Sequence, residues 1–216
     1  TGSMSEERGG HIAIVLPTGK ILVAGGRTLK VSGTETDAPI VVYHNSVELY
    51  DYATGKWSSE EDMIESRWNP TAILMEDGRL LVSGGEDSSG SLSTSEIYDP
   101  TTGLWTSTGS MSNLRSGHTA VLLSDGKVMV VGGAGDKVEI YDPQEGTWSA
   151  VSGLSQRMIR QGTVLMESGQ IITAGGFGST GPVSTSELYD PVTGNWTRIP
   201  GMSVTRVGPS SILLDS

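Results

Sequence analysis

The hydrophobic positions of the chain lie in short runs that recur four times. The clearest copy has one apolar run at residues 118–124 (HTAVLLS) and a second at residues 127–133 (KVMVVGG). Two further segments follow, the first with Glu-x-Tyr-Asp and the second with tryptophan. Runs of this length between turn residues are typical of strands, and no stretch has the period of a helix. Each copy therefore predicts four short strands, A to D.

The motifs recur at constant spacing, which defines the repeats. The separation from Glu to Trp is the same in every copy: Glu48 to Trp57, Glu96 to Trp105, Glu139 to Trp148 and Glu187 to Trp196. A Gly-Gly pair ends each B strand, and all variation in length falls between this pair and Glu-x-Tyr-Asp. We expect repeats at about 1–58, 59–106, 107–149 and 150–197, and a partial one at 198–216, in one domain of residues 1–216. Asp77-Gly78 and Asp125-Gly126 predict type I′ turns between strands A and B.

The combination of Arg-x-x-His, Gly-Gly, Tyr-Asp-Pro and Trp resembles the kelch family over essentially the whole chain. Gly-Ser-Met at residues 2–4 and 109–111 is most similar to the bacterial repeats. The resemblance implies an all-β, kelch-type β-propeller with strand A innermost, strand D outermost and a central channel. We expect four complete four-stranded antiparallel blades plus one extra strand at residues 208–214, as an arc of a larger propeller. Such an arc would self-associate through its open blade ends.

Residues present in every repeat most simply serve the architecture. The repeated tyrosines and tryptophans are expected to pack between blades, and Gly-Gly to allow close backbone approach or a positive φ. Arginines begin most A strands, and the repeated glutamates can pair with them. A repeated Arg–Glu pair is one interpretation, and a guanidinium cluster that binds carboxylates at the channel mouth is the other. In the fourth repeat Met158 replaces the arginine, between Arg157 and Arg160.

Strand direction predicts where a ligand would bind. Because the strands alternate in direction, the D–A connections and the B–C loops lie on one face, which also holds all the variation in length. On this loop face Arg27, Tyr43, His44, Glu86 and Asp87 are distinctive, and Trp68-Asn69 suits a sugar or a peptide unless it only covers the blade rim. The candidate ligand-binding residues are Arg8, Arg67, Trp68, Asn69, Arg115, Arg157, Arg160, Phe177, His11 and His118.

Composition excludes several kinds of chemistry. The net charge of −11 disfavours nucleic acid, and no apolar run is long enough to span a membrane. The chain has no cysteine, so disulfides, thiolate sites and the Tyr–Cys cofactor of kelch-type copper oxidases are excluded. His11 and His118 share a position in the repeat and are expected to hydrogen-bond in the channel lining rather than bind metal. We therefore expect no cofactor, no metal and no catalytic residue.

Three functions stay open at this stage. The leading hypothesis is a non-catalytic binding or scaffolding module for a protein or carbohydrate ligand. The second is a sugar-processing enzyme of the mutarotase or lyase kind, with arginines and histidines at the channel mouth as acid–base and carboxylate-holding groups. The third is a purely structural segment of a larger surface protein. The start at Thr1-Gly2-Ser3 has the look of a chain excised from something longer. The compartment is undetermined, with a lean toward a secreted or cell-surface bacterial protein.

Overall fold

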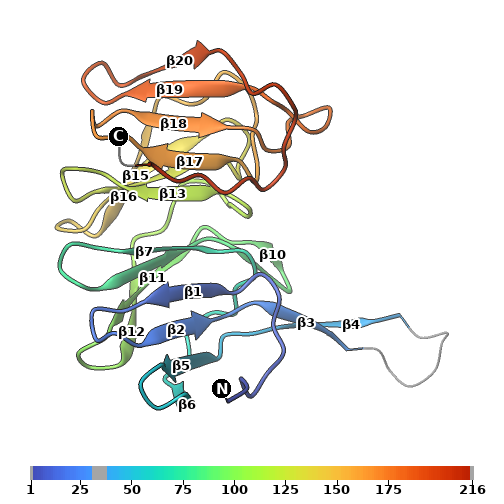
Figure 1. The fold of residues 1–216 in the computed structure, drawn as a ribbon, viewed down its shortest axis with the longest axis vertical. Helices are drawn as coiled ribbons and strands as arrows, with labels where there is room; N and C mark the ends of the chain where they lie inside the picture. Colours follow the sequence, from blue (N-terminus) through green and yellow to red (C-terminus); the bar gives the residue numbers. More distant parts are fainter. Residues whose placement is uncertain (1, 31–37, 215–216) are drawn as a thin grey trace. The chain divides into compact units, whose positions relative to one another are not determined.

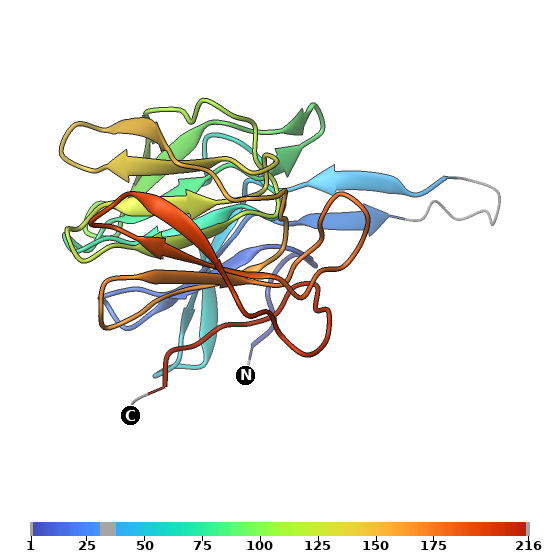
Figure 2. The same cartoon turned by 90° about the horizontal axis from the view of Figure 1, so that it is seen from above.

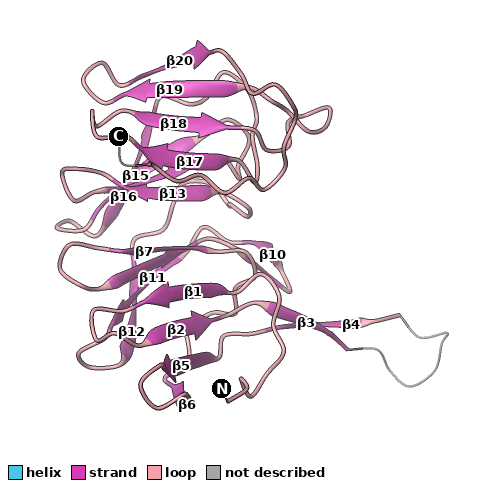
Figure 3. Cartoon of the chain, viewed as in Figure 1, coloured by secondary structure: helices cyan, strands magenta, loops and turns pink. Residues whose placement is uncertain are grey.

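The computed structural model describes residues 2–30 and 38–214, which form strands and turns without a helix (Figure 3). The chain divides into two compact units, Thr1–Thr108 and Gly109–Ser216, and each unit contains two four-stranded antiparallel sheets. Each sheet has the order A-B-C-D, with strand A at one edge and the tryptophan strand at the other (Figure 1). The predicted four-stranded blades are therefore confirmed. In the described part of the chain, no helix is long and apolar enough to cross a bilayer.

The first unit holds blades one and two and two small ribbons. Its strands are β1 (Ile12–Val15), β2 (Ile21–Ala24), β5 (Val47–Asp51) and β6 (Lys56–Glu60) in blade one, and β7 (Thr71–Leu74), β8 (Leu80–Ser83), β11 (Ser95–Asp99) and β12 (Leu104–Thr108) in blade two. The ribbons are β3 (Arg27–Lys30) with β4 (Ile40–Tyr43), and β9 (Glu86–Asp87) with β10 (Gly90–Ser91). The long B–C loop of blade one forms the β3–β4 ribbon, which projects from its blade (Figure 2).

The second unit holds blades three and four. Blade three contains β13 (Thr119–Leu122), β14 (Val128–Val131), β15 (Val138–Asp142) and β16 (Thr147–Val151), and blade four contains β17 (Gly162–Leu165), β18 (Ile171–Ala174), β19 (Ser186–Asp190) and β20 (Asn195–Ile199). The A strands β13 and β17 lie near each other, as do β1 and β7 in the first unit. Strand A is thus the inner strand of each pair of blades.

The core of each unit lies between its two blades. Tyr98 and Trp105 of blade two pack in one cluster with Leu22 and Leu49 of blade one. In the second unit, Tyr189 of blade four is buried in the corresponding cluster with residues of blade three. The tyrosine and tryptophan of every blade face each other across strands C and D, with ring centroids 5.0–5.1 Å apart. The clusters confirm the predicted packing between blades for the aromatic residues of blades two and four. Burial raises the pKa of Tyr98 to about 12.

The A–B turns differ from the predicted type I′. In blade two the Met75 amide donates to Arg79 O (2.8 Å) and the Gly78 amide donates to Met75 O (3.0 Å). The loop therefore has three residues, a type I turn followed by Gly78 at φ +83° in a G1 bulge. A type I′ turn would need a positive φ at Asp77, and Asn69 and Arg160 are the only described non-glycine residues with one. The prediction failed because it assumed a two-residue loop.

The Gly-Gly pairs link neighbouring blades within each unit. Gly25 and Gly26 have φ of +69° and +92°, and a Cβ on Gly25 would lie 2.6 Å from Arg67 O. The Gly26 amide donates to that same carbonyl at 2.7 Å. Gly133 makes the equivalent bond to Met158 O at 3.1 Å. Both predicted reasons for glycine, positive φ and close backbone approach, are confirmed.

The extra strand expected at residues 208–214 is absent, because this segment is irregular in the structure. Ser211 lies against Gly162 of β17, where a Cβ on the glycine would come within 2.0 Å of Ser211 Oγ. The segment therefore runs beside β17 without a ladder, and no described strand pairs with it as strand B would. The larger ring and the self-association of blade ends stay predictions.

Candidate binding face

Three of the repeated arginines are buried in ion pairs. Arg8, Arg67 and Arg115 are 9%, 0% and 0% exposed. Each pairs with the glutamate of its own repeat: Arg8 with Glu48 at 3.1 Å, Arg67 with Glu96 at 2.9 Å and Arg115 with Glu139 at 2.8 Å. The interpretation as a repeated Arg–Glu pair is thus confirmed. The alternative, a carboxylate-binding cluster at the channel mouth, is wrong for these three side chains, because the interior of the blade encloses them.

The third repeat shows how the pair holds its blade together. Arg115 Nη1 donates to Gly132 O (2.6 Å) and Lys137 O (2.8 Å), while the Ser112 amide donates to Glu139 at 2.7 Å. The pair therefore joins the D–A connection to both ends of the B–C loop. Burial lowers the pKa of Arg115, and the bond to Glu139 opposes that shift. Burial alone would raise the pKa of Glu139, but hydrogen bonds from Ser112 and Arg115 outweigh it and hold the pKa below its usual value.

In the fourth repeat a neutral methionine takes the place of the arginine of this pair. Met158 is fully buried at the arginine position, and Glu187 is 1% exposed without a cation. Ser155 satisfies Glu187 instead, because both its amide and its Oγ donate to the carboxylate at 2.9 Å. The flanking arginines Arg157 and Arg160 are exposed. The positive charge of this repeat therefore lies on the surface rather than in the blade.

Loops of the two blades meet on the loop face of the first unit. Backbone bridges join Gly9 to Arg27 and Trp68 to Glu86, so the D–A connections and B–C loops share a face, as the strand directions predict. The Arg27 guanidinium lies 3.4 Å from the ring centroid of Trp68, and Tyr43 Oη donates to Glu86 at 3.3 Å. We call Arg27, Tyr43, Trp68 and Glu86 the Trp68 cluster. Trp68 is half-buried, and the Arg27 guanidinium covers one face of its ring.

The loop face of the second unit carries the other candidates. Ile159 bridges to Phe177, which bridges to Pro182. Phe177 is 42% exposed, and Arg157 O lies near Gly178 of the same B–C loop. Arg160 runs along Gly117 of blade three, with its Cγ 3.3 Å from the place of a Cβ there. We call Arg157, Arg160 and Phe177 the Arg157 patch.

A left-handed backbone position recurs at the start of the A strands, and the sequence analysis missed it. Asn69 and Arg160 have φ of 50° and 53°. The equivalent residues are glycines with φ between 64° and 68°, namely Gly10, Gly117 and Gly208. Gap-free alignment of the repeats carries this signal, because it places glycine or asparagine at the position in every repeat except the fourth.

His11 and His118 occupy the same position at the start of strand A in their repeats. His11 Nδ1 donates to Arg8 O at 3.1 Å, and His118 is buried. Gln161, in the same position of the fourth repeat, donates to Val131 O at 2.6 Å and to Thr119 Oγ1 at 3.2 Å. His11 and His118 therefore belong to polar inner-strand positions. Within residues 2–30 and 38–214, no three His, Asp or Glu side chains group as metal ligands would.

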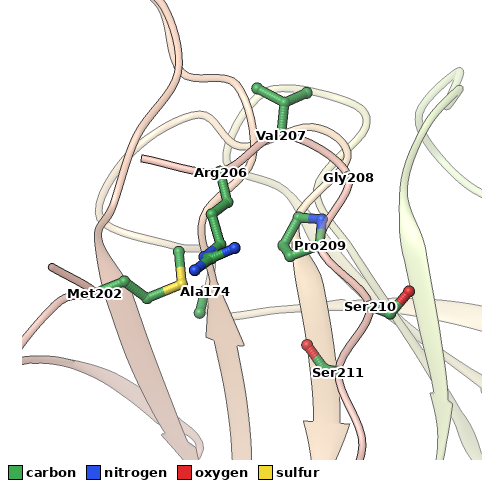
Figure 4. A pocket seen from close by; sticks show the side chains of 8 residues that line it. All are labelled: Ala174, Met202, Arg206, Val207, Gly208, Pro209, Ser210 and Ser211. Carbon is green, nitrogen blue, oxygen red and sulfur yellow. The ribbon is translucent and has the colours of Figure 1, made fainter. Parts of the chain in front are cut away.

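A pocket of about 500 Å³ lies at the end of blade four (Figure 4). Its lining comes from Ala174, Met202 and residues 206–211, and the Arg206 side chain extends into it between Met202 and Pro209. Arg206 has the repeat position at which Arg67 and Arg115 are buried. Because the arginines at this position in the other repeats have a structural role, we do not count Arg206 among the binding candidates.

Successive four-stranded antiparallel sheets with converging inner strands define the blades of a β-propeller. A family model described as "Kelch motif" matches residues 77–112 and 168–203. Together with the four-stranded antiparallel blades, these matches are consistent with a kelch-repeat β-propeller. No curated protein matched the chain in a sequence search. Kelch motifs are typical of propeller modules that bind or scaffold other proteins.

Proposed function

We propose that the chain is a non-catalytic binding module that takes up a segment of a protein partner on its loop face. The single observation that carries this proposal is the Trp68 cluster. There a cation–π contact holds the B–C loop of blade one against the D–A connection that leads into blade two, and a hydrogen bond joins it to the B–C loop of blade two. The B–C loops are the segments that differ most in length between repeats. Rigid loops on a repeated scaffold lose little conformational freedom when they bind, which favours affinity.

The buried arginines also favour binding over catalysis. The enzyme alternative assigned carboxylate-holding and acid–base roles to arginines and histidines of the repeats. Arg8, Arg67 and Arg115 are committed to ion pairs, and His118 is buried. A protein segment is the preferred ligand over a glycan because Arg27 covers one face of the Trp68 ring, which leaves less of the ring for a sugar to stack on.

A selection from a random displayed peptide library tests the proposal. We expect enriched peptides whose affinity falls at least about tenfold in Trp68→Ala or in Arg157→Gln, a loss of about 1.4 kcal/mol. The matched control is Tyr52→Ala, because Tyr52 is a 71% exposed aromatic beside Gly19 in the turns of the opposite face. Peptides that bind only through the opposite face would contradict the proposal. So would a chain that binds immobilised glycans through Trp68 and selects no peptide.

A further inference from the structure

We infer that the Arg157 patch is a subsite for side-chain carboxylates of an acidic protein segment. The inference rests on the proposed function, since it gives the chemistry of one part of the same loop face. It concerns blade four, whereas the Trp68 cluster lies in the other unit, so variants can test the two sites separately.

The first argument is the missing counter-ion. The chain has 25 acidic residues against 14 Lys and Arg, so carboxylates are abundant. Nevertheless, neither Arg157 nor Arg160 makes an ion pair or a side-chain hydrogen bond with any residue that the structure describes. Arg67 and Arg115, in contrast, are saturated with carboxylate and carbonyl acceptors. Two exposed guanidiniums, three residues apart in the sequence of an acidic chain, leave bidentate donor sets free for a ligand.

The second argument is the backbone of Arg160. Its φ of 53° is unfavourable for a long side chain, and the fold accepts glycine or asparagine at this position in the other repeats. Asn69 of blade two shows that a small side chain is sufficient to keep the geometry. The architecture therefore does not require arginine here, although it tolerates it. An arginine at a position whose backbone favours glycine or asparagine points to a role at the surface.

The third argument is the exposed ring of Phe177, which indicates an apolar residue next to the carboxylate of the peptide. Phe177 is 42% exposed and bridges to Ile159, which lies between the two arginines in sequence. A peptide with a carboxylate next to an apolar residue could pair with a guanidinium and pack on the ring at once. A sulfated polysaccharide would use the same charges but would leave the aromatic ring without a matching apolar group. The patch therefore favours an acidic peptide.

The experiment is a differential selection from the same displayed peptide library. Peptides are kept if they bind the wild-type chain and discarded if they bind the Arg157→Gln, Arg160→Asn double variant. We expect the retained peptides to be rich in Asp and Glu. Their affinity should fall at least about tenfold when these residues become Asn and Gln, and it should weaken as the salt concentration rises. Arg198→Gln, which removes an exposed arginine from the outer strand β20, should leave binding unchanged.

Arg160→Asn separates binding from folding. Asparagine suits the left-handed backbone, so this variant should melt at a higher temperature than wild type while it binds the retained peptides more weakly. A purely structural role of Arg160 would not move the two measurements in opposite directions. Arg157→Gln gives a second variant at an exposed position, where the fold is not at risk.

Several outcomes would overturn the inference. One is that no peptide survives the counter-selection, and another is that the survivors bind equally well after Glu-to-Gln replacement. A third is that heparin, but no acidic peptide, binds at these arginines. If peptides still bind in a Trp68-dependent way, the proposed function stands and only this inference falls. If no peptide binds the loop face of either unit, both are wrong.

Discussion

Replacing Arg115 by methionine tests whether the buried arginines hold the blades together. The substitution copies the fourth repeat, where Met158 fills this position. It removes a guanidinium that donates to Gly132 O at 2.6 Å, to Lys137 O at 2.8 Å and to Glu139 at 2.8 Å. Glu139 is fully buried and would keep its charge without a cation.

The expected loss of stability depends on the contacts that Glu139 keeps after Arg115 is removed. Removing one partner of a buried ion pair costs about 3–5 kcal/mol, because the other charge is left in a dry environment. Two hydrogen bonds to Glu139 would persist, from the Ser112 amide at 2.7 Å and from Asn113 Nδ2 at 3.2 Å. Methionine would also bury apolar surface in place of the guanidinium. We therefore expect the lower end of the range, a loss of about 3 kcal/mol in the free energy of unfolding.

Denaturant unfolding followed by circular dichroism measures this loss, and a double-mutant cycle assigns it. Arg115→Met, Glu139→Gln and the double variant are compared with wild type. A neutral amide needs no cation, so the double variant should lose about 1–2 kcal/mol less than the sum of the single losses. A loss below about 1 kcal/mol for Arg115→Met, or strict additivity in the cycle, would refute the reasoning.

Three further predictions follow from the repeated positions. Trp105→Ala should cost about 3–5 kcal/mol and Trp68→Ala clearly less, because Trp105 is 8% exposed in the core between blades; equal denaturation midpoints would contradict this. Met158→Arg should lower the free energy of unfolding by no more than about 1 kcal/mol, because Glu187 and the backbone carbonyls of the fourth repeat stand where the other repeats bind their arginine. Loss of the cooperative unfolding transition would count against this. Glu139 has a lowered pKa in the folded state, so its stabilising contribution is complete above its ordinary pKa of 4.5 and is lost as the pH falls through the folded value. Unfolding midpoints from about pH 6 to about pH 3 should show this loss, and Glu139→Gln should reduce it.

Much of the fold could be predicted from the sequence because each repeat contains short motifs whose spacing determines its strands and turns. The distance from Glu to Trp fixes a C–D hairpin whose ends pair as Tyr141 with Trp148 in blade three. The Gly-Gly pairs mark the points where neighbouring backbones approach too closely for a Cβ. Because these signals recur at constant spacing, errors at one repeat are corrected by the others.

What failed depended on partners that spacing does not reveal. The turn type at Asp77 required knowing that Met75 pairs with Arg79 across three residues. The strand at residues 208–214 required a hydrogen-bonded neighbour, which an apolar sequence does not supply by itself. The predicted set of binding residues included both buried and exposed arginines. Arg67 is buried and Arg157 is exposed, but the residue type is the same and does not reveal this difference.

The repeats thus separate architectural positions from candidate binding positions by comparison within one chain. Where a position is filled alike in the first three repeats, as with Arg67 and Arg115, the structure shows a buried interaction that each blade needs. Where the fourth repeat departs, Met158 takes over the buried place and Ser155 supplies the missing donor, so the blade stays intact. The charge then appears one residue before and two residues after Met158, at Arg157 and Arg160, which are both exposed. In the fourth repeat, substitutions inside the blade preserve the fold, and the positive charge lies on the loop face instead. We expect this pattern when a repeat of a scaffold has a binding role.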